Sequence, residues 1–534
     1  MLKKPKFWLI FLALIFSGVY FWLATPIKTN TNLSPRFDWP DETANYYWAK
    51  SYAQSGQLAV FEPLNLVAKN QIHPRSFNVL PDGSLVPGSF LGLILFYGIL
   101  AKIFSVKFLL YLTPLLAILG GLAFYSIIKK IFDQKVALLS TVLMYSHPAW
   151  WYYSVTPMLP NVAFVSLLLI SIYFLFKESK NSFSPVLVSG LLFGLAIAIR
   201  PAEIIWVGFI YLIILIYLRH KFTFTKVALF LAIAFLAIFP TLYQQQNLYG
   251  SFMSSGYDQL SQPTTTAACQ SCQIVKSLFL PFGFSPYLVA YNFWTHFLSR
   301  LWWLSLLALL GLIAFLTSPG KQKDEIFGYI LVSLFLFIWL GAYYGSWQFS
   351  DLLTVSLNTL GVSYVRYWLP LYLLSLPFIA FGLLWLTSFF KNRFKNLALV
   401  FLLLLIIYPN AKLVLFEKSD SIILVKERIG SYKQIASQVI NVTEPESVII
   451  TVRKDKVFFP ERKVIHTFDS LPKNQELLGI IPDLAKLVPV YYYALTAENN
   501  LQLANNLHLV LIKNIGSEVL YRVILENNNL VLTP

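Results

Sequence analysis

The sequence has 534 residues, of which 57% are hydrophobic and only 12% are charged, and its mean hydropathy is +0.63. This composition excludes a disordered chain, a collagen-like chain, a coiled coil and a conventional soluble enzyme of this length, and leaves a polytopic membrane protein. The formal net charge of +16 would suggest nucleic acid in a soluble protein. In a membrane protein it reflects cationic cytoplasmic loops, so no nucleic acid partner is expected.

Windows without Asp, Glu, Lys or Arg predict the membrane spans, because a span needs about 20 apolar residues. The first window follows Lys3, Lys4 and Lys6 and has no clear A-x-A cleavage site, so we expect an uncleaved span with a cytoplasmic N-terminus. The window 136–176 is long enough for two helices and a turn. The windows are 7–27, 83–101, 108–128, 136–176, 181–199, 204–218, 227–257, 301–320, 326–350, 367–390 and 396–411.

The distribution of cations decides whether the window 83–101 crosses the membrane. If it crosses, Lys129, Lys130 and Lys135 fall outside and every later loop inverts. If it dips in and returns, or lies along the outer face, six cytoplasmic segments hold sixteen Lys and Arg residues, and the external turn at 147–160 holds none. The positive-inside rule favours the second arrangement, which has eleven spans and an external C-terminus.

These spans leave three large external regions, and the last one is more polar than the rest. We expect a membrane domain over 1–414, with external loops at 28–107 and 244–296, and an extracytoplasmic domain over 415–534. In this last domain ERIGSYKQIASQVI and NQELLGIIPDLAKL have helical periodicity, whereas SVIITVR, VPVYYYAL, HLVLIKN and VLYRVILENNNLVLT are typical of strands. The predicted fold class is an all-α polytopic membrane domain with a small C-terminal α/β domain.

The first external loop opens with an acidic cluster, Asp38, Asp41 and Glu42, in PRFDWPDETANYYWAKSYAQSG. Pro40 predicts a helix start and Gly56 its end. Acidic residues here could simply cap the helix and complement its dipole. The functional alternative is a carboxylate at the outer surface that deprotonates a hydroxyl or helps to hold a metal. Because neighbouring helical residues point about 100° apart, we expect Asp41 to react and Glu42 to support it.

Four further residues are candidates for binding an anion at the same membrane face. His73 and Arg75 lie in HPRSFNVLPDGSLVPG, where both could also be solvated loop residues. Arg200 follows the apolar run GLLFGLAIAI, and Arg366 begins a span in SYVRYWLPLYLL. An Arg at a membrane surface commonly serves as an interfacial anchor, but its planar fork also grips phosphate with two hydrogen bonds.

The remaining motifs, and the absence of others, argue against several functional classes. Cys269 and Cys272 form CQSC, which we interpret as a local disulfide, because zinc usually takes four ligands. The sequence contains no P-loop, no G-x-G-x-x-G after a strand, no H-E-x-x-H and no G-x-S-x-G. The predicted spans carry almost no ionisable residue at mid-depth, which argues against an ion-coupled transporter.

Four stretches, in order, resemble the GT-C superfamily of integral membrane glycosyltransferases, in particular the branch with the protein O-mannosyltransferases and the lipid A aminoarabinose transferase. PDETANYYWAKSYAQSG is similar to the acidic motif of the first external loop, and GLAIAIRPAE to a Gly-rich span that ends in a basic residue. NLYGSFMSSGY is similar to the segment that opens the large later loop, and YVRYWLPL to an Arg-Tyr-Pro motif in a late span. The resemblance covers roughly 36–390.

This resemblance implies a helical membrane fold and the transfer of a sugar from a polyprenyl-phosphate donor to a hydroxyl of a glycan, lipid or protein, usually with inversion. Asp41 and Glu42 match the family's acidic pair, and Arg366 and Tyr367 match the late motif, for which the resemblance implies binding of the donor phosphate. Many relatives have an acidic residue in the second external turn, where this chain has Asn161. A divalent metal held between the two loops is therefore not expected, and no other cofactor is assigned.

The partners implied are the lipid-linked donor, the acceptor and the bilayer, and the implied location is the plasma membrane. Two alternatives stay open at this point. One is a transporter or flippase of lipid-linked glycans, and the other is a non-catalytic envelope assembly protein with an external binding domain. Neither alternative depends on chemistry at Asp41.

The cation distribution generates a prediction about topology. A cysteine placed at position 130 should face the cytoplasm, and one at position 76 should face outside, in a background that lacks Cys269 and Cys272. The measurement is labelling of intact cells with a thiol reagent that does not cross membranes. Labelling of position 130 from outside would overturn the eleven-span arrangement.

Overall fold

A computed structural model describes residues 5–26, 33–177, 182–260, 279–317, 324–348, 358–494, 502–503 and 507–525. The chain divides into two compact units, each built from segments that are distant in the sequence. Unit 1 comprises Met1–Thr25, Phe108–Thr241 and Pro263–Leu424, and unit 2 comprises Pro26–Lys107, Leu242–Gln262 and Val425–Pro534. Cys269 and Cys272 lie outside the described residues, and the boundaries predicted for the two domains stay a prediction.

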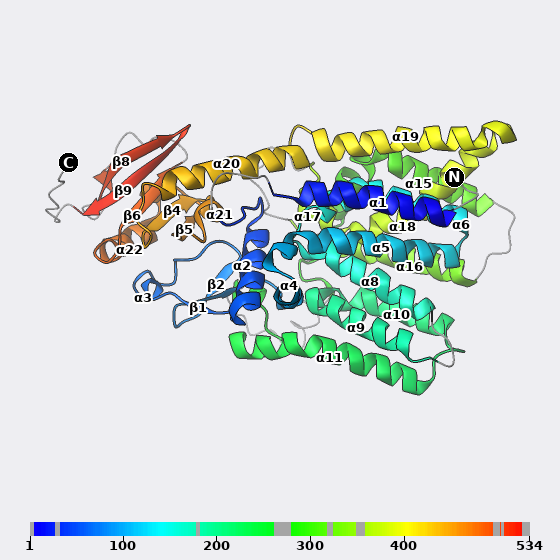
Figure 1. Cartoon of the computed structure of the whole chain (residues 1–534), viewed down its shortest axis with the longest axis horizontal. Helices are drawn as coiled ribbons and strands as arrows, with labels where there is room; N and C mark the ends of the chain where they lie inside the picture. Colours follow the sequence, from blue (N-terminus) through cyan, green and yellow to red (C-terminus); the bar gives the residue numbers. More distant parts are fainter. Residues whose placement is uncertain are drawn as a thin grey trace. The chain divides into compact units, whose positions relative to one another are not determined.

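Unit 1 is a bundle of helices (Figure 1). Most of its helices are continuous apolar segments. The hydrocarbon of a bilayer offers no hydrogen-bonding partner, so the backbone groups must bond to one another within the helix. They are α1 (Pro5–Ala24), α5 (Leu109–Ile131), α6 (Gln134–Ser146), α7 (Pro148–Ser154), α8 (Pro160–Phe176), α9 (Ser184–Ile199), α10 (Ile204–Tyr217), α11 (Phe224–Tyr249), α14 (Pro286–Phe293), α15 (Trp302–Thr317), α16 (Asp324–Gly345), α17 (Ser363–Tyr367), α18 (Leu369–Ser388) and α19 (Asn392–Phe416).

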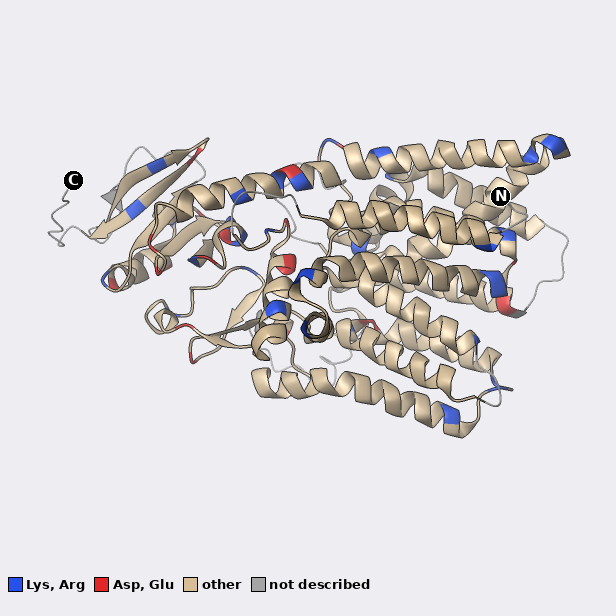
Figure 2. Cartoon of the chain, viewed as in Figure 1, with Lys and Arg blue, Asp and Glu red and all other residues tan. Residues whose placement is uncertain are grey.

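Six described helices are long and apolar enough to cross a bilayer, or eight if each of two bent helix pairs counts as one span. The bent pairs are Ser184–Ile199 with Pro201–Tyr217, at 113°, and Pro286–Ser299 with Trp302–Thr317, at 92°. In Figure 2 the long helices of this bundle carry little charged colour along their middles. The chain is thus a multi-pass membrane protein, and the count of eleven spans stays a prediction.

Unit 2 contains a mixed sheet of six strands in the order β5-β4-β6-β9-β8-β7. Its first three strands are parallel, and the other pairings are antiparallel. The strands are β4 (Val448–Val452), β5 (Lys463–Thr467), β6 (Val490–Ala494), β7 (Gln502–Leu503), β8 (Leu507–Ile515) and β9 (Glu518–Leu525). The accompanying helices are α20 (Ile422–Ile440), α21 (Asp455–Phe458) and α22 (Gln475–Ala485). The C-terminal α/β fold predicted from the sequence is therefore confirmed.

The segment Pro26–Lys107, which contains the predicted first external loop, contributes most of the rest of unit 2. Its elements are α2 (Pro40–Ser55), β1 (Val60–Phe61), α3 (Leu64–Val67), β2 (Phe77–Val79), β3 (Ser84–Pro87) and α4 (Leu91–Ile103), to which the segment 242–262 adds α12 (Gly256–Leu260). The three short strands pair antiparallel in the order β1-β3-β2. Helix α4 occupies the ambiguous window 83–101 and has 13 residues, fewer than the roughly 20 that a span needs.

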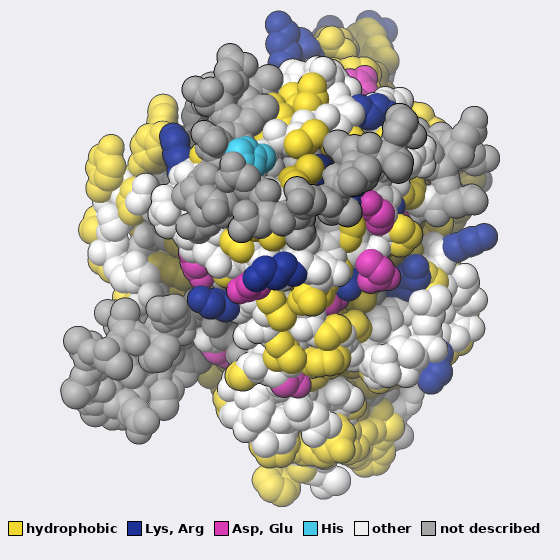
Figure 3. All heavy atoms as spheres, turned by 90° about the vertical axis from the view of Figure 1, so that its left-hand side faces the viewer, with side chains coloured by type: hydrophobic (Ala, Val, Ile, Leu, Met, Phe, Trp, Pro, Cys, Tyr) yellow, Lys and Arg dark blue, Asp and Glu magenta, His cyan; other side chains and the backbone are white. Residues whose placement is uncertain are grey.

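One hydrophobic core joins the first loop to the C-terminal segment within unit 2. Trp48 of α2 and Phe77 of β2 share a cluster of buried side chains with Tyr432 of α20 and Phe459. Trp48 is fully buried, and its ring lies 5.3 Å from that of Phe77. Elsewhere the surface mixes charges of both signs with apolar side chains, as Figure 3 shows for one face.

Candidate functional site

Helix α2 begins and ends where its sequence predicts. Pro40 occupies the first helical turn, and the Glu42 carboxylate accepts a hydrogen bond from the backbone N–H of Trp39 at 3.3 Å. This satisfies one of the amide groups that every helix start leaves without a partner. Gly56 ends the helix in the left-handed conformation, with φ of 75°, which favours glycine. The start of α2 thereby fixes the directions in which the Asp41 and Glu42 side chains point.

Asp41 is half-buried, and its carboxylate is oriented by a hydroxyl from another part of the first loop. The Ser76 hydroxyl donates to Oδ1 of Asp41 at 2.6 Å. Ser76 has φ of 63°, and its carbonyl accepts from the Gly88 N–H at 3.1 Å. A Cβ at Gly88 would lie 2.7 Å from that carbonyl oxygen, so only glycine permits this approach. The carboxylate that the sequence singles out is thus held in place and remains partly open to solvent.

Glu42 lies beside Asp41 in the sequence but has a different environment. Its side chain is only 3% exposed, and burial raises the pKa of Glu42 to about 8, with a further contribution from the nearby Asp38 carboxylate. At neutral pH Glu42 is therefore mostly protonated and cannot accept another proton. Of the two carboxyl groups, Asp41 is the one that the environment suits to act as a base.

Asp38, the third member of the acidic cluster, is neutralised by two cations of the C-terminal segment. Arg428 approaches its Oδ2 at 2.8 Å and Lys456 its Oδ1 at 3.8 Å. The Lys456 ammonium also lies 5.0 Å from the centre of the Tyr432 ring. Asp38 therefore ties the loop before α2 to α20 and α21 within unit 2, and its role is structural.

Arg75 and His73, which the sequence suggested for anion binding, both face the C-terminal segment. Arg75 binds Asp455 through its backbone N–H and its Nε, each at 2.8 Å, and through Nη2 at 2.7 Å. Burial would raise the pKa of Asp455, but the Arg75 guanidinium brings it below its ordinary value. The His73 ring lies 5.2 Å from that of His466, and burial lowers the pKa of both imidazoles, that of His466 to about 4.

A second group of polar residues lies in unit 1, where Arg200 follows α9. Its Nε and Nη2 both donate to Oε1 of Glu203, at 2.9 and 2.6 Å, and Nη2 also donates to the Tyr344 hydroxyl at 2.9 Å. The indole N–H of Trp206 donates to the other carboxylate oxygen at 2.5 Å. Arg200 is 7% exposed, so its charge is buried and is compensated by Glu203.

Tyr367 lies between the two arginines that the sequence selected. The guanidinium carbon of Arg200 is 4.7 Å from the centre of its ring, and that of Arg366 is 5.2 Å away. The ring also stacks on Tyr344 at 4.4 Å and 3°. Arg366 donates from Nη2 to the Ser363 hydroxyl at 3.0 Å. We call Arg200, Glu203, Tyr344, Arg366 and Tyr367 the arginine cluster.

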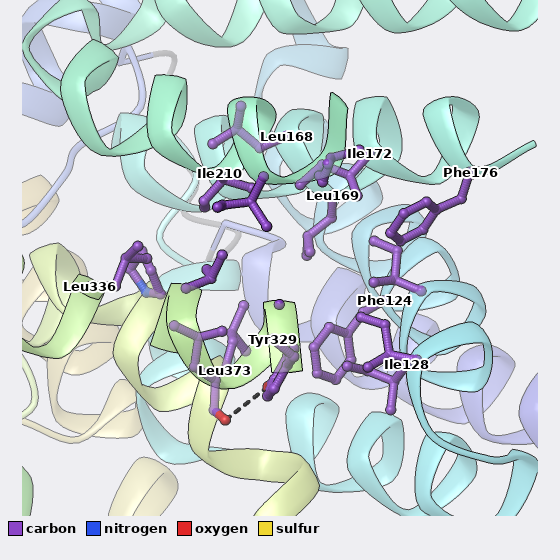
Figure 4. Close-up of a pocket in the computed structure, with 18 of the residues that line it drawn as sticks. Phe124, Ile128, Leu168, Leu169, Ile172, Phe176, Ile210, Tyr329, Leu336 and Leu373 are labelled. Carbon is purple, nitrogen blue, oxygen red and sulfur yellow. Dashed lines mark hydrogen bonds between the residues drawn. The ribbon is translucent and has the colours of Figure 1, made fainter. Parts of the chain in front are cut away.

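An apolar groove of about 160 Å³ lies among α5, α8, α10, α16 and α18 of unit 1. Figure 4 shows Leu168, Leu169 and Phe176 on one side of the space and Phe124, Ile128 and Tyr329 on another. Its lining from α8 runs from Val165 to Phe176 and that from α10 from Trp206 to Tyr217. Each stretch is about 16 Å long, roughly half of the 30 Å hydrocarbon core. Trp206 joins the groove to the arginine cluster, because it lines the groove and donates to Glu203.

The residues around Asp41 do not fit a resident divalent cation. Among the described residues there is no group of three or more His, Cys, Asp or Glu side chains that could hold a metal ion. Asp38 is engaged by two cationic side chains, and Glu42 is mostly protonated at neutral pH. We therefore derive no step through a metal.

The structure adds residues that sequence analysis did not select. Glu203 could have been found, since a carboxylate three residues after an Arg is a common helical pairing. Ser76, Asp455 and Tyr344 gave no signal, because each becomes relevant only through a partner far away in the chain. The assignments of Asp41, Glu42, Arg366, Tyr367, Arg200, His73 and Arg75 to catalysis or substrate binding stay predictions.

Comparisons with known proteins extend this picture. Residues 92–243 match the model of a family described as dolichyl-phosphate-mannose-protein mannosyltransferase. No curated protein matches the chain.

Among solved structures, ArnT from Cupriavidus metallidurans matches in its apo state with a TM-score of 0.52 and 12% identity, over 96% of this chain and 97% of that chain. The same protein bound to undecaprenyl phosphate matches with 0.52 and 11%, over the same shares. The Archaeoglobus fulgidus oligosaccharyltransferase tethered with an acceptor peptide matches with 0.52 and 12%, over 92% and 70%. The predicted resemblance is confirmed, and the chain has the fold of the GT-C superfamily of membrane glycosyltransferases.

The environment of Glu42 predicts how stability depends on pH. Unfolding returns the pKa of Glu42 from about 8 to about 4.5, so the folded state binds more protons between these values. Its contribution to stability is complete below about pH 4.5 and is lost as the pH rises through 8, by a few kcal/mol at most. Glu42→Gln should therefore match the native protein at pH 5 and be more thermostable at pH 8.5, measured by thermal unfolding in detergent.

The matched control for this prediction is Glu446→Gln, because the side chain of Glu446 is 77% exposed. This variant should follow the native pH dependence. An identical pH dependence for the native protein and Glu42→Gln would show that Glu42 is ionised in the folded state.

Proposed function

We propose that the protein transfers a sugar from a polyprenyl-phosphate donor to an acceptor hydroxyl, with inversion at the anomeric carbon. One observation carries the proposal: in unit 1 a cluster of two arginines and two stacked tyrosines is joined by Trp206 to an apolar groove. A phosphate on a long isoprenoid chain needs both a cationic site and an apolar path. The family match and the fold shared with ArnT, solved with undecaprenyl phosphate, support the same class of donor.

In this proposal the isoprenoid chain occupies the groove and the phosphate binds Arg366. The groove offers the chain only apolar side chains over most of its length, from Leu336 and Pro370 to Phe176. Arg366 supplies the planar fork that phosphate oxygens accept from, and Tyr367 limits the movement of the guanidinium. This charge stabilises the phosphate as it leaves, which is where negative charge develops in the reaction.

Arg200 has a positioning role in the proposal. Its charge is already compensated by Glu203, and its guanidinium lies against the Tyr367 ring and donates to the Tyr344 hydroxyl. The pair thereby fixes Tyr344 and Tyr367, and these fix Arg366. Removing one member of a buried ion pair is costly, typically 3–5 kcal/mol, so loss of Glu203 would disturb the whole arginine cluster.

Asp41 acts as the general base. It takes the proton of the acceptor hydroxyl while the acceptor oxygen forms a bond to the anomeric carbon. The bond from that carbon to the phosphate oxygen breaks, and the polyprenyl phosphate leaves with the electron pair. The Ser76 hydroxyl donates to Oδ1 of Asp41 at 2.6 Å, so the carboxylate does not rotate freely. Glu42, buried and mostly protonated, supports the start of α2 and does not react.

The location and orientation of the protein complete the proposal. The sixteen clustered cations favour an external first loop and C-terminal segment. We propose the plasma membrane as the location. The acceptor is a hydroxyl of a glycan, lipid or protein. The flippase and the assembly protein considered above need no base, so the next experiment separates them from an enzyme.

Asp41→Asn tests the role of the base. Asn keeps the size, can still accept from Ser76 and caps a helix about as well as Asp, so the protein should fold normally. Loss of the base should reduce sugar transfer by at least about 10²-fold. The measurement is transfer from a labelled polyprenyl-phosphate sugar in liposomes, normalised to folded protein. Asp483→Asn is the control, since its side chain is 65% exposed. Activity of Asp41→Asn within a few-fold of native would remove Asp41 from the mechanism.

Arg366→Lys tests donor binding, because it keeps the charge but loses the planar fork. We expect the apparent KM for the donor to rise about 10-fold, equal to the loss of one charge-assisted hydrogen bond, with the yield of folded protein unchanged. Titration of the donor at fixed acceptor concentration measures this. If Arg366→Ala used the donor as well as the native protein does, Arg366 would be an interfacial anchor only.

A further inference from the structure

A cleft of about 280 Å³ lies along α2 beside the hydrophobic core, and two of its lining residues, Tyr47 and Phe459, also pack in that core. Thr43, Tyr46, Tyr47, Lys50, Ser51 and Gln54 line it at helical spacing, three or four residues apart. The turn at Phe459 and Pro460 and the residues before α2, including Phe37, form the other walls. All of these residues belong to unit 2.

Two pairs of aromatic rings flank this cleft. The rings of Phe37 and Tyr46 lie 5.2 Å apart at 47°, and those of Tyr47 and Phe459 lie 4.9 Å apart at 57°. Because the two rings of each pair pack against each other, their positions are fixed at the edge of the cleft. Aromatic walls with a few directed polar groups are the usual composition of a small-molecule site.

Three residues that line the cleft carry a polar group that makes no hydrogen bond or ion pair to any described residue. The Tyr46 and Tyr47 hydroxyls and the Lys50 ammonium take part in none of the hydrogen bonds or ion pairs of that part of the chain, although all three residues are at least half-buried. Burial raises the pKa of both phenols, so they remain hydrogen-bond donors at neutral pH. Lys50 is the one charged residue that lines the cleft in the described structure.

We propose that this cleft binds a saccharide unit that carries a negatively charged substituent. A pyranose ring has apolar C–H faces, which suit the aromatic pairs, and an edge of hydroxyls, which suit the phenols and Gln54. A carboxylate or phosphate on the sugar is the group that Lys50 recognises. The volume is close to the lower end of ligand pockets, about 300 Å³, so one or two sugar units fill it.

This inference rests on the proposed function, and it gives the acceptor a chemical class. An acidic glycan held by the face of α2 that begins with Thr43 would be bound by the same helix that carries Asp41. The Asp41 carboxylate does not line the cleft, so binding and proton transfer are separable.

The experiment uses the purified full chain in detergent and compares trigalacturonic acid with the neutral trisaccharide maltotriose. Saccharide binding is followed by saturation-transfer NMR and by titration. The acidic saccharide should bind about 10-fold more tightly, and Lys50→Gln should abolish this difference. Tyr47→Phe, which keeps the ring, should weaken both saccharides about fivefold. Lys102→Gln is the matched control, because Lys102 is exposed on α4 away from the cleft, and it should bind as the native protein does.

Three results would overturn the inference. They are no saturable binding by the native protein, equal affinity for the two saccharides, and an equal loss of affinity in Lys50→Gln and Lys102→Gln. Asp41→Asn separates this inference from the proposed function, since it should bind the acidic saccharide normally and transfer sugar at least about 10²-fold more slowly. Saccharide binding without any transfer by the native protein would remove the proposed function alone. Transfer to a neutral acceptor without saccharide affinity would remove the cleft alone.

Discussion

The contact between Arg75 and Asp455 is the constraint on which unit 2 depends. Asp455 is almost completely buried, and a carboxylate in such a place is tolerated only when a cation compensates it. The compensating guanidinium comes from the segment Pro26–Lys107, so this segment cannot separate from α21 without leaving an uncompensated charge in an apolar interior. Lys456, the next residue of α21, then reaches Asp38 just before α2. The placement of Asp41 follows from this pairing of distant segments.

The same physical requirement organises unit 1. Arg200 is buried beside an apolar groove, and Glu203 compensates it within one turn of chain. Trp206 and Tyr344 both donate hydrogen bonds to the Glu203 carboxylate. Tyr367 stacks on Tyr344 and limits the movement of Arg366. In both units, a charge pair without a chemical role in the proposed mechanism sets the position of a residue that the proposal places in the reaction. Protonation of Glu42 is a third solution to the same problem, because a neutral carboxyl group needs no cation.

The features that the sequence predicted are those with local causes. The start and end of α2 follow from Pro40 and Gly56, and the membrane helices follow from long apolar windows. Asp41 stood out because acidic residues are few. Ser76 and Asp455 did not, because their importance comes from contacts across the chain that no spacing reveals. The short strand β5 was also missed, since its five residues, KVIHT, have a weak pattern and β4 is the one strand of the sheet with which they pair.

Two glycines near Ser76 make the position of its hydroxyl sensitive to substitution. Gly88 leaves no room for a Cβ next to the Ser76 carbonyl, and a Cβ at Gly256 would lie 2.5 Å from the backbone of Gly88. Three stretches of main chain are therefore in contact, with only hydrogen atoms between them, behind the hydroxyl that binds Asp41. Neither glycine has a functional group, yet a single added methyl would shift the donor of a 2.6 Å hydrogen bond. In the proposed mechanism, the position of the Asp41 carboxylate is therefore sensitive to the close backbone packing at Gly88 and Gly256, two residues that contribute no atoms to the reaction.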